Sequence, residues 1–184
     1  MKRTETAIPG VCLVDAPLFA DERGHFFETW REDKFAAIGI TCRFVQDNQS
    51  FSRRGVLRGL HYQLGRPQAK LIRVVAGEVF DVAVDLRPGS ATFGRWAGET
   101  LTAAGRRMMF VPEGFAHGFY VLSDSAEVLY KASDVYAPAE ERGLRWDSPE
   151  VAIAWPLRGA PVVAPRDALF PTLSKIPPAD LPRP

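Results

Sequence analysis

The sequence has little net charge, little cysteine and no long apolar run, and each shortage excludes a class of protein. Lysine and arginine number 23 against 22 aspartate and glutamate residues, which gives a formal net charge of +1 at pH 7. Without an excess of positive charge, the chain has no overall field that attracts nucleic acid or an anionic membrane surface. Neither partner is expected, and any anionic ligand must be held by locally placed arginines.

Cysteine is limited to Cys12 and Cys42, which form no C-x-x-C pair. Two thiols in a chain of this size are interpreted as reduced and packed, which indicates the cytoplasm. The N-terminal residues MKRTETAIPGVCLVDAP lack the sustained apolar segment and the cleavage signature of a signal peptide. No window approaches the roughly 20 consecutive apolar residues that a membrane helix requires. We therefore expect neither secretion nor membrane insertion.

Short β-rich runs separated by turn formers make up most of the sequence. Residues 70–87 contain two such runs broken at Gly77-Glu78, which predicts a hairpin. The second run alternates with the period of two that is typical of a strand. One face carries Phe80, Val82, Val84 and Leu86, and the other carries Asp81, Ala83 and Asp85. Further strands are predicted over 95–101, 108–111, 119–122 and 126–133, with a loop over 112–118.

Helix is scarce in this pattern. Residues 31–38 carry acids in the first turn and end at Gly39, which predicts one short helix, and a second helical turn is predicted over 139–143. The proline-rich segment from Ala160 onward is predicted to wrap the surface as extended chain. Many short strands and almost no helix indicate one all-β domain over residues 1–184, with a core over about 8–170. A double-sheet jelly roll (a double-stranded β-helix) and a lone β-sandwich both fit.

Two of the three histidines, His61 and His117, lie near glycines and apolar residues in segments predicted as strand or strand end. Each could be an ordinary core histidine, but two in such settings with charged neighbours favour a pocket. His25 follows an Arg-Gly turn and is interpreted as an exposed loop residue. Metal-binding jelly rolls usually present two histidines as H-x-H, whereas here Gln63 replaces the second histidine and the cation Lys70 follows downstream. No metal site is expected, because metals need several neutral or anionic ligands.

A histidine, a lysine and a carboxylate in a dry cavity suit proton transfer at a carbon next to a carbonyl group. A neutral imidazole can remove the proton near pH 7, and a carboxylate on its second nitrogen fixes the tautomer. A fixed ammonium stabilises the enolate oxygen that forms. An acid on the opposite face then inverts the stereocentre. Tyr130 is a candidate acid because a phenol keeps its proton at pH 7, although a packed core aromatic is the commoner role for a tyrosine.

Arginines at positions 23, 54, 58 and 166 lie in loops or strand ends beside these residues. A guanidinium binds phosphate through two parallel hydrogen bonds, but each of these arginines could also be a solvated surface charge, which is how Arg54 is interpreted. Arg58 stands three residues before His61 in an otherwise apolar strand. A buried cation there needs an anionic partner, and a diphosphate is a natural one.

Seven stretches of the sequence form a longer pattern. They are DERGHFFETW (21–30), QDNQSFSRRGVLRGLHYQ (46–63), KLIRVVAGEVFDVAVDLR (70–87), SATFGRW (90–96), VPEGFAHGF (111–119), EVLYK (127–131) and YAPAEERGLRWDSP (136–149). In order and spacing they resemble the dTDP-4-dehydrorhamnose 3,5-epimerase family of the cupin superfamily. The likeness covers roughly residues 8 to 170, which is far more specific than any single motif.

The resemblance implies a cupin jelly roll and a homodimer whose active sites take residues from both subunits. It also implies an epimerase that needs no cofactor and acts beside the C4 ketone of a dTDP-linked 4-keto-6-deoxy sugar. By the matching motifs, His61 is the base, Tyr130 the opposing acid and Lys70 the cation that stabilises the enolate. Asp167, in the segment APRDALFP, completes a dyad with His61.

The same resemblance implies a set of substrate contacts. His117 lines the sugar pocket, and Phe26 and Tyr136 sandwich the thymine ring between aromatic faces. Arg166 stands where the family often has lysine before the dyad aspartate, and is expected to bind substrate. The remaining contacts to nucleotide, diphosphate or sugar are Arg23, Glu28, Gln46, Asn48, Arg58 and Glu141.

The leading interpretation is a 3,5-epimerase of dTDP-L-rhamnose biosynthesis that converts dTDP-4-dehydro-6-deoxy-α-D-glucose to dTDP-4-dehydro-β-L-rhamnose. The first alternative is a relative that inverts only C3 or only C5, or acts on another nucleotide-linked 4-keto-6-deoxy sugar. A metal-dependent cupin and a non-catalytic sugar-binding cupin are the others. The set of His61, Lys70 and Tyr130 argues against a lectin, which has no use for a base and an acid on opposite faces.

Overall fold

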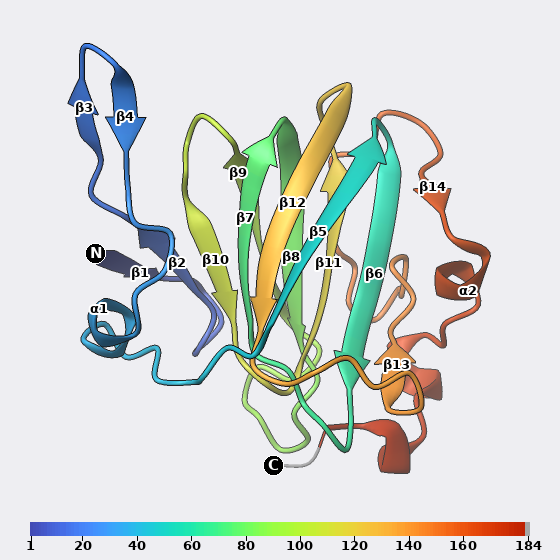
Figure 1. Ribbon diagram of the computed structural model, residues 1–184. Coiled ribbons are helices and arrows are strands. Elements are labelled where there is room, and N and C mark those ends of the chain that lie inside the picture. Colours follow the sequence, from blue (N-terminus) through green and yellow to red (C-terminus); the bar gives the residue numbers. More distant parts are fainter. Residues whose placement is uncertain (183–184) are drawn as a thin grey trace.

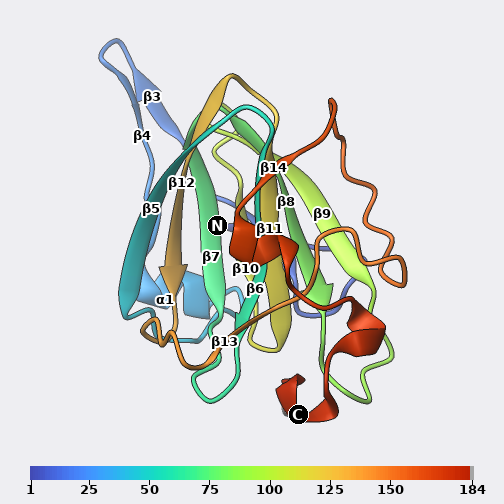
Figure 2. The ribbon, with the colours of Figure 1, turned by 90° about the vertical axis from the view of Figure 1, so that its right-hand side faces the viewer.

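Two six-stranded sheets lie face to face in the computed structural model, which describes residues 1–182 (Figures 1 and 2). The predicted domain extends two residues further, outside this part. The first sheet contains, in spatial order, β1 (Lys2–Glu5), β2 (Cys12–Asp15), β10 (Met108–Val111), β7 (Lys70–Ala76), β12 (Ser125–Ala132) and β5 (Gln46–Arg53). The second contains β13 (Glu141–Gly143), β6 (Val56–Gln63), β11 (Phe115–Val121), β8 (Glu78–Asp85) and β9 (Trp96–Thr102), with β14 (Val162–Val163) beside β6. The all-β prediction is confirmed.

The chain alternates between the sheets, as in a jelly roll. From β5 to β8 each strand lies in the sheet opposite its predecessor. The hairpin predicted at Gly77-Glu78 is therefore wrong, because β7 pairs with β10 and β12 whereas β8 pairs with β9 and β11. Gly77 alone separates β7 from β8, which is too short for a two-residue hairpin turn. Its φ is +76° and a Cβ would lie 2.0 Å from the Ser125 carbonyl oxygen, so glycine is needed to turn this corner.

The interior between the sheets forms the largest apolar core. Val74 of the first sheet and Phe119 of the second both belong to it. The alternation predicted for β8 is confirmed: Ala83 belongs to this inner core, whereas Val82 and Val84 join a second cluster on the other face of the sheet. Asp81, on the same face of β8 as Ala83, is fully buried. A carboxylate therefore stands inside the apolar core.

The C-terminal segment covers the outer face of the second sheet (Figure 2). Ile176 is buried there in one cluster with Leu60. The prediction of an extended tail is wrong in part, since the segment contains α2 (Pro165–Ala168) and the 3₁₀ turns η1 (Leu173–Lys175) and η2 (Pro178–Asp180). Proline stands in the first turn of α2 and of η2, where its missing N–H removes no helical hydrogen bond.

Two other element predictions need correction. Residues 141–143 form β13, and not the helical turn predicted over 139–143, because their backbone pairs with β6 from Gln63 to His61. The strand predicted over 119–122 begins earlier, at Phe115, because residues 115–118 pair with β8. This change places His117 within a strand and not in the predicted loop 112–118.

The predicted N-terminal helix is confirmed as α1 (Glu32–Ala36). Phe35 is buried, and its ring centroid lies 4.5 Å from that of Trp30. Both rings pack on a third cluster, which includes Cys12. Cys12 and Cys42 are free thiols.

A hairpin of β3 (Phe19–Asp21) and β4 (Gly24–Phe26) projects away from the two sheets, at the upper left of Figures 1 and 2. Phe19 is 61% exposed and Phe26 is 66% exposed. Two large aromatic rings at the surface of one small hairpin are a feature of interaction sites. Within residues 1–182, the helices are all too short or too polar to cross a bilayer.

Candidate active site

A cavity of about 340 Å³ lies between strands of the two sheets. Strands β5, β7 and β12 of the first sheet and β6 and β11 of the second supply its walls. Ten predicted site residues line it: Gln46, Asn48, Arg58, His61, Lys70, His117, Tyr130, Tyr136, Glu141 and Arg166. Residues far apart in the sequence therefore meet in a single cavity.

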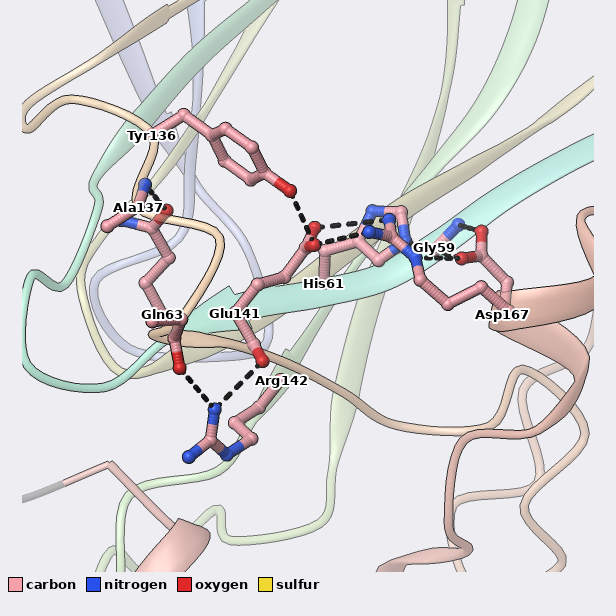
Figure 3. Close-up of polar contacts among 10 residues, drawn as sticks. Gly59, His61, Gln63, Tyr136, Ala137, Glu141, Arg142 and Asp167 are labelled. Carbon is pink, nitrogen blue, oxygen red and sulfur yellow. Dashed lines mark hydrogen bonds and ion pairs between the residues drawn. The ribbon is translucent and has the colours of Figure 1, made fainter.

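His61 and Asp167 form the predicted dyad at the wall made by β6 (Figure 3). His61 Nε2 lies 2.9 Å from Asp167 Oδ1, and the backbone N–H of Gly59 donates to Oδ2 at 3.0 Å. Gly59 has a φ of +111°, and a Cβ there would lie 2.7 Å from the Cα of Gly118. Glycine thus permits the close contact between β6 and β11 that brings this N–H to the carboxylate. Two hydrogen bonds fix the carboxylate, and the carboxylate orients the imidazole.

The electrostatics of the dyad suit a base. Burial raises the pKa of Asp167, but the hydrogen bond and charge of His61, the Gly59 N–H and the charge of Arg166 outweigh it and hold the pKa below its ordinary value. Asp167 is therefore ionised at neutral pH. An ionised carboxylate accepts a hydrogen bond from the imidazole and stabilises the imidazolium that forms on proton uptake.

Lys70 lies on β7, in the sheet that faces β6. It is 9% exposed, and its Nζ donates to the carbonyl oxygen of His61 at 3.5 Å. Burial lowers the pKa of the Lys70 ammonium to about 8, although the charges of Glu141 and Asp81 oppose that effect. At pH 7 the group is therefore charged. Over residues 1–182 it forms no ion pair, so its charge is available to a ligand oxygen.

Tyr130 lies on β12, beside β7 and in the sheet opposite His61. Burial raises the pKa of its phenol, and the nearby charge of Arg58 opposes this only in part. The phenol therefore holds its proton at neutral pH, as an acid must. The candidate base and the candidate acid come from facing sheets and line one cavity.

Polar side chains of β5 form another wall. Gln46 Nε2 donates to Asn48 Oδ1 at 2.9 Å. Arg58 lies on β6, the next strand along the chain and part of the other sheet. It donates to Ser52 Oγ at 2.8 Å and to the Phe51 carbonyl oxygen at 3.2 Å. These partners are neutral, and within residues 1–182 the guanidinium has no carboxylate partner. The burial expected for Arg58 is wrong, because the residue is exposed on β6 and water can solvate its charge. Arg58 still lines the cavity, where its guanidinium can bind an anionic group of a ligand.

Ser50 also lines the cavity and is a residue that the sequence interpretation missed. Its Oγ is buried and has no hydrogen-bond partner among residues 1–182. The signal was present, because the period of two in a strand puts Ser50 on the face that carries Gln46 and Asn48. A buried hydroxyl without a partner costs about 1–3 kcal/mol, which a ligand atom can recover.

Tyr136, Glu141 and Arg166 form a connected group at the exposed edge of the cavity. Tyr136 donates its hydroxyl proton to Glu141 Oε2 at 2.8 Å (Figure 3). Arg166 donates to the two oxygens of Glu141 at 2.5 and 3.2 Å. Tyr136 is 47% exposed, so one face of its ring is open. Through Glu141, the exposed ring of Tyr136 is thus connected to Arg166, which precedes Asp167 in the sequence.

The remaining predicted contacts, Arg23, Phe26 and Glu28, do not line the cavity of their own chain. Arg23, on the projecting hairpin, pairs with Asp21 at 2.5 Å. Glu28 lies at the base of the hairpin and pairs with Lys34 and Arg31. The structure therefore separates these three from the other predicted site residues.

Gln63, which stands where a metal-binding jelly roll would have its second histidine, braces a neighbouring loop. Its amide nitrogen donates to the Arg66 and Val135 carbonyl oxygens at 2.7 and 3.3 Å, and its amide oxygen accepts from Ala137 N at 2.8 Å. In residues 1–182 no three His, Cys, Asp or Glu side chains gather in a metal-binding arrangement.

The family model for dTDP-4-dehydrorhamnose 3,5-epimerase matches residues 5–175. A dTDP-4-dehydrorhamnose 3,5-epimerase of Pseudomonas aeruginosa is 55% identical over 168 residues, which cover 91% of this chain and 93% of that protein. A dTDP-4-dehydrorhamnose 3-epimerase of Streptomyces niveus is 44% identical over 169 residues, covering 91% of this chain and 81% of that protein.

A solved structure extends the likeness to nearly the whole chain. The crystal structure of dTDP-6-deoxy-D-glucose-3,5-epimerase from Legionella pneumophila, in complex with dTDP-4-keto-L-rhamnose, superposes with a TM-score of 0.96. Its sequence is 46% identical, and the match covers 99% of this chain and 97% of that one. The predicted cupin jelly roll is thereby confirmed. The chain belongs to the dTDP-4-dehydrorhamnose 3,5-epimerase family of isomerases.

Proposed function

We propose that this chain inverts C3 and C5 of dTDP-4-dehydro-6-deoxy-α-D-glucose and so produces dTDP-4-dehydro-β-L-rhamnose. The observation that carries the proposal is that His61 and Tyr130 lie on facing sheets and line one cavity with Lys70. The Legionella relative bound to dTDP-4-keto-L-rhamnose supports the ligand class. Both carbons flank the C4 ketone, so one set of groups can serve both inversions.

Each inversion is a proton removal followed by a proton return. His61 takes the proton from the carbon beside the ketone, and the bonding electron pair moves to the ketone oxygen to form an enolate. The Lys70 ammonium stabilises the negative oxygen. Tyr130 then gives its phenolic proton to the opposite face of the same carbon, and the ketone re-forms. Exchange with water returns His61 and Tyr130 to their starting forms before the second carbon reacts.

The rest of the cavity would hold the nucleotide and the sugar. Arg58 has an uncompensated charge for the diphosphate, and Gln46 and Asn48 stand beside it on β5. His117 would contact the sugar. The open ring of Tyr136 suits stacking with thymine, with Glu141 and Arg166 holding that edge.

Incubation with the substrate in D₂O tests the reaction. Deuterium at both C3 and C5 of the product, read by NMR, supports the double epimerase. Label at a single carbon supports instead a single epimerase, such as the activity named for the Streptomyces relative. Binding without label at either carbon would mean a sugar-binding protein. Activity that is lost with a strong chelator and restored by a metal would point to the metal-dependent alternative.

The pH dependence should report on Lys70, whose pKa is lowered to about 8 by burial. The ammonium stabilises the enolate and the neutral amine does not, so kcat is expected to fall as the pH rises through about 8. Lys70→Arg should move this fall to higher pH, because a guanidinium keeps its proton above pH 12. Lys131→Arg, on the same sheet and paired with Asp47, is the matched control and should leave the pH profile unchanged. An identical alkaline limit in Lys70→Arg would remove Lys70 from this role.

The projecting hairpin suggests a homodimer in which each subunit completes the site of the other. Arg23 and Phe26 are exposed on it, and neither reaches the cavity of its own chain. A twofold arrangement would let β3 and β4 of each subunit bring these residues, and Glu28 at their base, to the cavity of its partner. Phe26 would then face Tyr136 across the thymine ring.

Mixing two inactive variants tests this arrangement. A hairpin variant with Arg23→Ala and Phe26→Ala and a cavity variant with His61→Ala are unfolded together and refolded. Each mixed dimer would contain one site with both halves intact, so random pairing should restore about a quarter of the unchanged activity. Each variant refolded alone should stay inactive. A mixture without activity would show that each site is built within one chain.

A further inference from the structure

His117 and Asp81 form a second histidine–carboxylate pair in the wall of the cavity. His117 Nε2 lies 2.9 Å from Asp81 Oδ1 and 3.0 Å from Oδ2. Asp81 is fully buried on β8 and His117 is 7% exposed on β11. His117 is also the direct register partner of His61 on β6, so the two imidazoles stand side by side in one sheet.

Asp81 has no other hydrogen-bond partner among residues 1–182. It stands on the inner face of β8, two residues from Ala83 and directly across from Phe119, which both belong to the apolar core. A buried carboxylate in such surroundings is costly unless a proton donor or a cation compensates it. Here the compensating groups are the imidazole of His117 and, through space, the ammonium of Lys70.

The contact with both carboxylate oxygens requires a proton on His117 Nε2. This fixes the tautomer and leaves Nδ1 as the ring nitrogen without a protein partner within residues 1–182. His117 and Lys70 both line the cavity in which the enolate oxygen would form. The negative charge of Asp81 favours the ammonium form of Lys70, and that form stabilises an enolate.

We propose that Asp81 is a positioning residue of the epimerisation: it locks His117 with Nε2 protonated, so that Nδ1 accepts a hydrogen bond from a sugar hydroxyl, and from behind the cavity wall it supports Lys70 as the stabiliser of the enolate. This rests on the proposed function. Asp81 does not touch the substrate and acts through the two cavity residues. The charged groups that act on Lys70 are Asp81 from β8 and Glu141 from β13, with the imidazoles of His61 and His117 beside it in the cavity.

Asp81→Asn tests the proposal, because the amide keeps the shape of the side chain and removes its charge. We expect kcat to fall about 10- to 100-fold with KM changed less than about threefold, since the loss concerns the charged transition state and not ground-state binding. The alkaline fall of kcat should move to lower pH, because Lys70 loses a carboxylate that supports its proton. In a His117→Gln background the same change should cost much less, because Asp81 would then have lost the residue it positions.

Asp85→Asn is the matched control. Asp85 is also a fully buried carboxylate on β8, but it binds Arg87, Ser90 and Thr92 outside the cavity. This variant should lower the melting temperature and leave kcat and its alkaline limit unchanged. Asp81→Asn should instead lower kcat and move its alkaline limit to lower pH. A wild-type kcat and pH profile in Asp81→Asn, or a full effect that persists in His117→Gln, would overturn the proposal.

A measurement on the unchanged protein separates this proposal from the epimerase assignment. The chain has only three histidines, so the ¹⁵N signals of His117 can be assigned by their loss in His117→Gln. We expect a proton on Nε2 that exchanges slowly with water. An unprotonated Nε2 would refute the role of Asp81 even if the enzyme inverts both carbons.

Discussion

Replacing His61 with alanine is expected to lower deuterium exchange at C3 and C5 by on the order of 10²–10⁴-fold, the usual contribution of a positioned general base. The base is the first group to act at either carbon, so exchange at both should be lost together. The dyad geometry supports this expectation, since Asp167 is held by Gly59 and binds His61 at 2.9 Å. Rates follow from NMR of the substrate and product pools in D₂O.

Binding of dTDP by the same His61→Ala variant is the control for this experiment. Calorimetry should give an affinity near that of the unchanged protein, because the nucleotide and diphosphate contacts proposed for Arg58, Gln46 and Tyr136 do not involve the imidazole. Loss of dTDP binding would indicate a damaged cavity. Exchange that continues near the wild-type rate in a variant that still binds dTDP would exclude His61 as the base.

Replacing Tyr130 with phenylalanine is expected to separate inversion from exchange. The variant lacks the proton donor on the opposite face, so product formation should fall by on the order of 10²–10⁴-fold. His61 can still remove a proton and return deuterium to the same face. Deuterium should therefore enter the unreacted substrate at least about ten times faster than product appears, which NMR of both sugars measures.

Tyr120→Phe provides the matched control for Tyr130→Phe. Tyr120 is also a buried strand tyrosine, but its hydroxyl accepts from the backbone N–H of Arg158 and does not line the cavity. Both rates should stay near wild type in this control. Equal loss of exchange and inversion in Tyr130→Phe would count against Tyr130 as the acid, and so would product formation at the wild-type rate.

The dyad also has a consequence for stability in acid. The pKa of Asp167 is held below its ordinary value by its partners, so its ionisation stabilises the folded state above the unfolded pKa of about 4. That contribution is lost as the pH falls through the lower, folded-state pKa. The same partners that orient the base therefore help to tie α2, and with it the C-terminal segment, to β6.

Local chemistry was enough to predict several elements. The alternation along residues 80–86 placed apolar and acidic side chains on opposite faces of β8, because a strand exposes successive side chains on opposite sides. Acidic residues in the first turn and a glycine after the last turn likewise predicted α1 within residues 31–39. Each of these signals lies within a few residues, so no distant partner is needed to interpret it.

Two of the errors share one cause, the unknown pairing of strands, and the third concerns proline. The run broken at Gly77 predicted a hairpin, but a strand's sequence does not specify which sheet supplies its hydrogen-bond partners. Residues 141–143 have a helical composition locally, yet pairing with β6 made them a strand. In the C-terminal segment, proline in a first turn permitted the short helices that proline content alone argued against.

For the site, the motifs and the family resemblance identified ten residues that the structure brings to one cavity. Three others, Arg23, Phe26 and Glu28, stand apart on or below the projecting hairpin, which a single chain's sequence could not reveal. Ser50 and Asp81 were missed as site residues. Asp81 looked like one more acid on a strand, because only the pairing of β8 with β11 brings His117 to it.

By itself, the amino-acid sequence determined the all-β class and the membership of the epimerase family, and it predicted the residue types proposed here for proton transfer. Those properties depend on side-chain chemistry and on patterns with a period of two. The tertiary structure alone decided which strands share a sheet, that His61 and Tyr130 come from facing sheets, and that a buried carboxylate contacts His117. These depend on hydrogen bonds between segments far apart in the chain. The same contacts shift the pKa values, since burial lowers that of Lys70 and the partners of Asp167 lower that of its carboxyl.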